Sequence, residues 1–464
     1  MARVSSDPTA PEERDSARDY GRSAGLLTGA LGIAGVLTYG YFAIASHNLS
    51  ADAYGDIVIL WSVVFLLAST LFRPVEQLLA SSLAEQEQAD VSSSSSLRSA
   101  ALIQGGLSTA IVLVLLIARG PIEDELFAGQ DTLYWILIAS LLGFALAYYA
   151  RGFLAGRRQF NLYAALLVIE VSARLAFAVF VAIGLASGTD FVALGIATAP
   201  VACIIVLPLA VRRGRPLGAG PATGHGGGGG AEFTLSKGGA FAGAVLVMML
   251  SEQILVNSGA LFVRAELGSA AAGFIFNMMM VARAPLVLFQ AVAASLLPHL
   301  TRLRARGDEN SREVFRSSVD NTLLLIGAFA TATFIGVVTI GPQVMQIAFG
   351  DQFTYDRIGL GIVAIGMGLY LAAASLNQAA LAQAQAHRAA ICWIGCAALF
   401  VLINVTDLMN PFRSVEVGFT LSAAVLATLL YILYRNPMAS AADEIEPGSG
   451  RELQAQLTAT DEII

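Results

Sequence analysis

The chain has 464 residues, of which 56% are hydrophobic and only 13% are charged, and its mean hydropathy is +0.69. This composition excludes an ordinary soluble domain and indicates a protein that crosses a membrane several times. The formal net charge of −7 says little about partners, because most charged residues lie in tails and connections, where the local sign matters more than the sum.

The first 25 residues are polar and mixed in charge, and they lack the apolar core and cleavage site of a signal peptide. We expect residues 1–25 to form a disordered cytoplasmic tail. Twelve apolar runs follow, each near the ~20 residues that a transmembrane helix needs. The predicted spans are residues 26–46, 56–80, 99–118, 132–150, 160–186, 191–211, 238–262, 270–298, 320–340, 358–384, 388–405 and 415–434.

The distribution of Arg and Lys predicts the orientation of these spans. With the N-terminus inside, 20 of the 27 basic residues, including Arg151, fall in cytoplasmic segments, and three fall within spans. The four in outer loops are Arg119, Arg264, Arg357 and Arg413. Because cytoplasmic loops carry an excess of basic residues, we expect both termini to be cytoplasmic.

A glycine-rich segment between the sixth and seventh spans separates two similar halves. LSADAYG at residues 49–55 aligns with LGSAAAG at residues 267–273, and LFRPVEQLLASSL in the second span aligns with LFQAVAASLLPHL in the eighth. Six spans per half make the repeats parallel, with a cleft between two lobes. The expected divisions after the tail are a first lobe at 26–211, a flexible cytoplasmic linker at 212–237, a second lobe at 238–434 and a cytoplasmic tail at 435–464.

Several stretches resemble one family of membrane proteins. They are LSADAYGD and LGSAAAGF between two helices of each half, SEQILVNSGALFVRAELG, IAFGDQFTYDRIGLGIVAIG and LAQAQAHRAA. The pattern resembles the polysaccharide-exporter and flippase branch of the multidrug/oligosaccharidyl-lipid/polysaccharide (MOP) superfamily, over about residues 26–434. The resemblance implies an all-α polytopic membrane protein with twelve transmembrane helices in two parallel six-helix lobes, the fold that the superfamily shares with MATE transporters.

The resemblance also implies a function. The protein is expected to be an alternating-access flippase in a bacterial plasma membrane, moving a polyprenyl-diphosphate-linked saccharide to the outer leaflet for surface-polysaccharide or cell-wall assembly. In related flippases, helices one, two, seven and eight line the cavity and carry cations for the diphosphate. The expected partners are this lipid-linked saccharide, membrane lipids and glycosyltransferases or polymerases, with no nucleic acid and no enzymatic activity.

Three arginines within spans are the first candidates for the cleft. A guanidinium at membrane depth is costly on a lipid-facing surface and binds a diphosphate well, so Arg283 and Arg73 are the predicted diphosphate-binding residues. Arg73 can instead extend to the inner headgroups or pair with Glu76, and Pro74 is expected to bend its helix. Arg174 follows Glu170 by one turn, which favours a structural ion pair.

Glu252 is an acid within the seventh span and a candidate for coupling to a monovalent cation or proton, with Asn404 and Asp407 as the second wall. A buried glutamate satisfied by its neighbours is the alternative. Cys203, Cys392 and Cys396 lie in apolar runs and are interpreted as packing residues, and the four histidines lack metal spacing, so neither a metal nor a cofactor is expected.

Two rival functions remain open at this stage. The first is a multidrug or organic-cation antiporter of the same superfamily, which cationic residues in the cleft disfavour and Glu252 favours. The second is a non-transporting scaffold within a glycan-assembly complex. Drug efflux without an effect on surface saccharide would indicate the antiporter, and tolerance of substitutions in the cleft would indicate the scaffold.

Overall fold

The computed structural model describes residues 10–88, 95–203, 205–206, 208, 237–294, 309–383, 385–406 and 408–435, and this part of the chain consists of helices and their connections, without strands. The first half contains a short helix, α4 (Arg119–Pro121), and the longer helices α1 (Ala10–Asn48), α2 (Ala51–Gln88), α3 (Ser95–Ile117), α5 (Asp131–Gly156), α6 (Phe160–Ala182) and α7 (Thr189–Thr198). The second half contains α9 (Lys237–Asn257), α10 (Gly259–Leu267), α11 (Ser269–Ala294), α13 (Glu309–Phe349), α14 (Arg357–Ala382), α15 (Ala386–Val405) and α16 (Pro411–Arg435).

Most of the predicted spans correspond to helices in the described residues. Within the described ranges, nine helices are long and apolar enough to cross a membrane, and the bent pair α9 and α10 makes a tenth span. Shorter apolar helices, Thr189–Val201 and Ser269–Ala284, lie where the sixth and eighth spans are predicted. Lipid offers no hydrogen bonds to a bare backbone, which is why long apolar runs form helices here.

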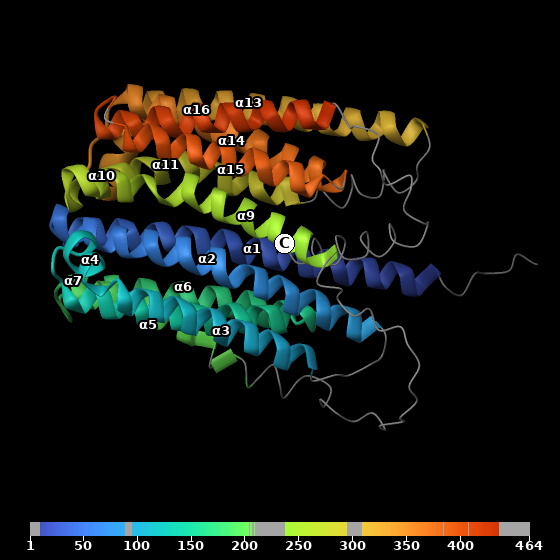
Figure 1. Cartoon of the computed structure of the whole chain (residues 1–464), viewed down its shortest axis with the longest axis horizontal. Coiled ribbons are helices and arrows are strands. Elements are labelled where there is room, and N and C mark those ends of the chain that lie inside the picture. Colours follow the sequence, from blue (N-terminus) through green and yellow to red (C-terminus); the bar gives the residue numbers. More distant parts are fainter. Residues whose placement is uncertain are drawn as a thin grey trace, which may run out of the picture.

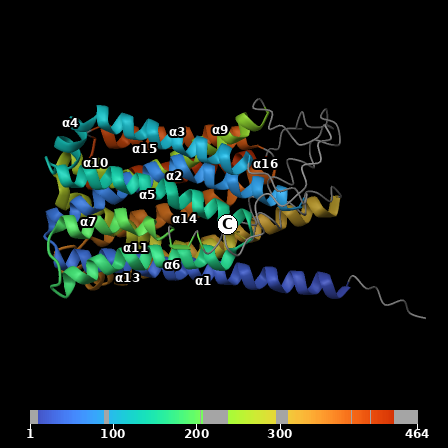
Figure 2. The same ribbon diagram turned by 90° about the horizontal axis from the view of Figure 1, so that it is seen from below.

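The helix pairings of the first half are repeated in the second. In the first half α1 packs on α6, α2 on α5, and α7 on both α5 and α6; in the second α9 packs on α15, α11 on α14, and α16 on both α14 and α15. The halves meet where α2 packs against α9 and α11 (Figure 1). Helices α4 and α10 lie at the same end of the bundle in both views (Figure 1 and Figure 2). We call this the predicted outer end.

The start of α1 differs from the expectation. Residues 10–25, assigned by sequence to a disordered tail, are the first turns of α1. The linker 212–236 and the C-terminal tail 436–464 lie outside the described residues.

The seventh predicted span is broken, although it contains no proline. Helices α9 and α10 meet at Ser258 with a bend of 45°. The hydroxyl of Ser258 donates to the carbonyl of Ile254 at 2.6 Å, a contact that bends helices. A Cβ at Gly259 would lie 2.8 Å from Val415, so glycine allows α16 to pack against the break. By contrast, α2 stays helical through Pro74.

Close packing of α2 on α5 fixes part of the site. A Cβ at Gly152 of α5 would lie 2.7 Å from the carbonyl oxygen of Glu76, and a Cβ at Gly156 would lie 2.8 Å from that of Ala80. Small residues four positions apart let two membrane helices approach closely. This contact places Glu76 beside α5 and α6.

Candidate functional site

A cavity of about 500 Å³ lies between the two halves. Helices α1 and α2 of the first half and α9 and α11 of the second form most of its wall, and α5, α6 and α14 complete it. Its lining combines aromatic and aliphatic side chains with seven ionisable groups other than tyrosine: Arg73, Glu76, Arg151, Glu170, Arg174, Glu252 and Arg283. Four of these are arginines and three are glutamates, so their formal sum is +1.

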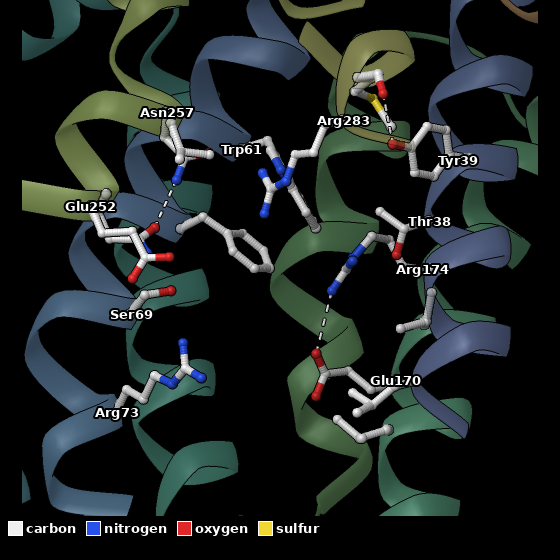
Figure 3. Close-up of a pocket in the computed structure, with 18 of the residues that line it drawn as sticks. Thr38, Tyr39, Trp61, Ser69, Arg73, Glu170, Arg174, Glu252, Asn257 and Arg283 are labelled. Atoms are coloured by element: carbon white, nitrogen blue, oxygen red, sulfur yellow. Dashed lines mark hydrogen bonds and ion pairs between the residues drawn. The ribbon is translucent and has the colours of Figure 1, made fainter. Parts of the chain in front are cut away.

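Arg73 and Arg283 lie on facing walls of the cavity. Figure 3 shows Arg73 on α2 and Arg283 on α11, both directed into the open space. In the described ranges, neither guanidinium group makes a hydrogen bond or an ion pair. Both cations are therefore available to an anion that enters.

The length of α2 tests whether the side chain of Arg73 can reach the inner lipid headgroups, which was the alternative to a place in the cavity. The predicted span ended at residue 80, about two turns beyond Arg73, within reach of the inner headgroups. In the structure α2 continues to Gln88, which lies 15 residues, or about 22 Å, beyond Arg73. Arg73 also lines the cavity, so the structure favours the cavity over the membrane surface as its environment.

A buried charge cluster forms the α5–α6 side of the wall. Glu170 accepts hydrogen bonds from Arg151 through one oxygen and from Arg174 through the other, the latter at 3.4 Å. The guanidinium carbon of Arg174 lies 4.4 Å from the ring centre of Trp61, and that of Arg151 lies 4.9 Å from that of Tyr148. Two cations share one carboxylate, so the cluster carries a formal excess of one positive charge, partly stabilised by aromatic faces.

The position of Arg151 corrects the sequence analysis, which counted it in a cytoplasmic loop. Helix α5 continues to Gly156, and Arg151 is buried against Glu170, which lies 19 positions away in the sequence. Glu76 was expected to pair with Arg73, but its hydrogen bond comes from the hydroxyl of Tyr163, at 2.9 Å.

Glu252 lies on α9, on the wall opposite the buried charge cluster. Its partner among the described residues is Tyr370, whereas the sequence analysis expected Asn404 and Asp407. The hydroxyl of Tyr370 on α14 donates to Glu252 Oε1 at 2.5 Å. Asn404 does not line the cavity; it is buried in α15, and its amide donates to the carbonyl of Phe400 at 2.8 Å. Asp407 lies outside the described residues. The structure therefore does not join Glu252 to Asn404 in one site.

An interaction between the halves, absent from the sequence analysis, closes the predicted outer end. Asp56 of α2 accepts from the hydroxyl of Ser269 at 2.6 Å and from the guanidinium group of Arg264 at 3.3 Å, and Arg264 also donates to Ser269. Gln130 donates to the other oxygen of Asp56 at 2.7 Å. We call Asp56, Arg264, Ser269 and Gln130 the latch.

Further contacts between the two halves reinforce the latch. A Cβ at Gly55 would lie 1.8 Å from the carbonyl oxygen of Ser269, so only glycine fits where α2 meets α11. Tyr54 donates to Asn277, and Gln352 donates to the carbonyl of Ser46 at 2.7 Å. Arg264, assigned by sequence to an outer loop, is buried here because α10 packs against α2. The sequence feature that could have indicated the latch is Asp56, an acid at the start of an apolar run.

The arrangement defines a two-lobed polytopic membrane protein with a charged cavity between its lobes. Comparison with protein-family models and with curated protein sequences found no match. Solved structures do match in fold. The chain superposes on an inward-facing multidrug resistance MATE family transporter of the MOP superfamily with a TM-score of 0.67 and 12% identity, covering 89% of this chain and 97% of that one.

Two further structures give similar results. An outward-facing multidrug resistance MATE family transporter of the MOP superfamily matches with a TM-score of 0.59 and 16% identity, over 90% of this chain and 95% of that one. A MOP superfamily transporter from Pyrococcus furiosus, described as having a reverse polarity of its binding pocket that suggests a different function, matches with a TM-score of 0.56, 17% identity and the same coverage. The chain therefore has a MATE-like fold.

Proposed function

We propose that the protein is an alternating-access flippase that moves a polyprenyl-diphosphate-linked saccharide from the cytoplasmic to the outer leaflet of a bacterial plasma membrane. The observation that carries this proposal is the pair Arg73 and Arg283, two guanidinium groups on facing walls that are unpaired in the described part of the chain. A guanidinium binds phosphate oxygens through two parallel hydrogen bonds, and one cation for each phosphate suits a diphosphate.

The formal charge of the whole cavity supports the same preference for an anion. Arg151 and Arg174 share the carboxylate of Glu170, and Glu76 lies beside them, so this wall is formally neutral, whereas the seven ionisable groups of the whole lining sum to +1. A net positive charge attracts anions and repels cations. The cluster of Arg151, Arg174 and Glu170 is too well paired to bind the diphosphate directly, so the unpaired Arg73 and Arg283 carry the proposal.

The latch supports alternating access. It joins the lobes at the predicted outer end, which corresponds to a state open toward the cytoplasm. The comparisons point the same way, because the TM-score is 0.67 with the inward-facing transporter and 0.59 with the outward-facing one. In this scheme the substrate enters from the cytoplasmic side, and the latch must open before the saccharide is released.

The first test is depletion of the protein followed by mass spectrometry of the cell's lipid-linked saccharides. Accumulation of one polyprenyl-diphosphate glycan supports the proposal and identifies the cargo. Arg283→Ala and Arg73→Ala should each lower the rate of export about 10- to 100-fold, the loss of one charge-assisted bidentate contact, at unchanged protein level. Arg98→Ala, which removes an exposed arginine in the first turn of α3, is the matched control. Normal export by both cavity variants would overturn the proposal.

A multidrug or organic-cation antiporter is the second candidate, and one observation favours it. Glu252 faces the cavity, and its hydrogen bond comes from the neutral hydroxyl of Tyr370, so its charge is not cancelled by that partner. This reading predicts that Glu252→Gln abolishes efflux of cationic dyes while surface saccharide is unaffected. The flippase reading predicts unchanged dye retention on depletion of the protein.

A further inference from the structure

A second cavity lies at the predicted outer end of the second lobe, separate from the central one. Its volume is about 600 Å³, and it forms where the connection between α13 and α14 meets α11 and the start of α16. Three aromatic side chains contribute to its lining, Phe274, Tyr355 and Phe412, and the rings of Tyr355 and Phe412 lie edge to face at 6.0 Å. We call it the outer pocket.

The polar side chains of the outer pocket are already fixed by one another. Glu416 accepts from the hydroxyl of Tyr355 at 2.5 Å through one oxygen and from Arg413 at 2.6 Å through the other. Arg413 also donates to Asp356 at 2.8 Å, and the same Asp356 oxygen accepts from the backbone N–H of Gly359 at 3.3 Å. The group is therefore held in one geometry before any ligand arrives.

The protonated state of Tyr355 helps to keep these side chains in their fixed geometry. Burial, followed by the hydrogen bond to the Glu416 carboxylate, raises the pKa of Tyr355 well above its ordinary value. The tyrosine therefore remains a hydrogen-bond donor at any physiological pH. Its ring is held in place as one wall of the pocket.

This combination distinguishes between ligand classes. Arg413 binds both Asp356 and Glu416, so each carboxylate already has a cationic partner, although the three groups together keep a formal charge of −1 and an organic cation is therefore the competing ligand in the test below. A sugar hydroxyl is both donor and acceptor, so it can bind to the free lone pairs and N–H groups of a paired arginine and carboxylate without breaking the pair. Aromatic rings suit the apolar face of a sugar ring, and the exposed Asn410, whose side-chain oxygen already accepts from the backbone N–H of Phe412 at 3.1 Å, adds a side-chain NH₂ donor.

The outer pocket is also connected to the closed end of the central cavity. The ring of Phe274 lies 5.0 Å from that of Phe353, which lies 4.9 Å from that of Tyr54 on α2. Tyr54 is two residues from Asp56 of the latch. Separation of the lobes at this end would therefore remove Tyr54 from the aromatic row and change the setting of Phe274 in the pocket wall.

We propose that the outer pocket is a saccharide-binding site on the release side of the protein, where the rings of Phe274, Tyr355 and Phe412 stack on sugar rings and the paired Arg413, Asp356 and Glu416 bind hydroxyl groups. The assignment of the saccharide to the exported cargo rests on the proposed function. The binding of free saccharide does not. A pocket of this kind would hold the sugar part of the cargo as it leaves the cavity.

The test uses the full-length protein in lipid nanodiscs. The probe is the mixture of water-soluble saccharides that mild acid releases from the lipid extract of the producing cells. Hydrogen–deuterium exchange should show protection of residues 352–356 and 410–416, and Phe412→Ala should weaken the apparent affinity about tenfold. Leu408→Ala, an exposed change beside the pocket, is the matched control and should bind as the wild type does.

Three outcomes would overturn the inference. They are no protection at any saccharide concentration, equal affinity of the Phe412→Ala protein, and protection by tetraphenylphosphonium but not by saccharides, which would mark a cation site. Arg283→Ala separates this inference from the proposed function, because it removes a cavity cation and leaves the outer pocket intact. Saccharide binding that survives in Arg283→Ala, together with normal export by both Arg283→Ala and Arg73→Ala, would retain the pocket and reject the flippase.

Discussion

The latch gives the most direct test of how the two lobes are held together. Asp56→Ala removes the acceptor of two hydrogen bonds from the other lobe, one from Ser269 at 2.6 Å and one from Arg264 at 3.3 Å. A hydrogen bond to a charged group contributes roughly 1.5–3 kcal/mol, and the longer one contributes least. The expected loss is about 3 kcal/mol, which changes the ratio of closed to open molecules more than a hundredfold.

Pulsed electron–electron resonance can measure that ratio. Spin labels at Leu185→Cys and Leu408→Cys, on exposed residues at the predicted outer end of the two lobes, report their separation in a background that lacks the three native cysteines. The wild type should give one short-distance population, and Asp56→Ala should add a longer one. Asp124→Ala, an exposed acid at the same end, should behave as the wild type does. An unchanged distance distribution in Asp56→Ala would refute the role of the latch.

Two further predictions concern packing and buried charge. Gly55→Ala should open the same end without altering any charge, because its Cβ would lie 1.8 Å from the backbone carbonyl oxygen of Ser269, and a wild-type label distance would contradict this. Glu170→Gln should lower the free energy of unfolding by about 3–5 kcal/mol, because Arg151 and Arg174 lose their shared carboxylate, and thermal denaturation in detergent measures it against Glu125→Gln at an exposed site.

Hydropathy was sufficient to predict most of the fold. In the described part of the chain, ten of the twelve predicted spans correspond to helices that can cross a membrane when the bent pair counts as one, and shorter apolar helices lie at the sixth and eighth. An unsatisfied backbone is costly in lipid, so a long hydrophobic run forms a helix. The break at Ser258 was not predictable in this way. It depends on a hydroxyl bonded back to Ile254 and on Val415 of a helix more than 150 positions away in the sequence. A hydropathy profile cannot predict either of these contacts.

The candidate site was predicted in part. Arg73 and Arg283 were placed in the cleft because an unpaired cation is costly in lipid, and both line the cavity. Arg151 and Arg264 were not predicted to be buried, because their acidic partners are distant in the sequence. A count of basic residues in loops treats every arginine near the end of a span as exposed, whereas each of these finds an acid on another helix, Glu170 and Asp56 respectively. Partner choice across helices is a property of the packed structure.

The broken span α9–α10 contributes residues both to the central cavity and to the latch. Helix α9 carries Glu252 and Asn257 on the cavity wall, and α10, beyond the 45° bend, carries Arg264 in the latch. Binding and opening are then linked equilibria, and their coupling free energy is reciprocal. A cargo that favours the opened latch by a given factor must bind the opened protein more tightly by that same factor. The affinity of the cavity and the stability of the closed end therefore cannot be changed independently through this segment.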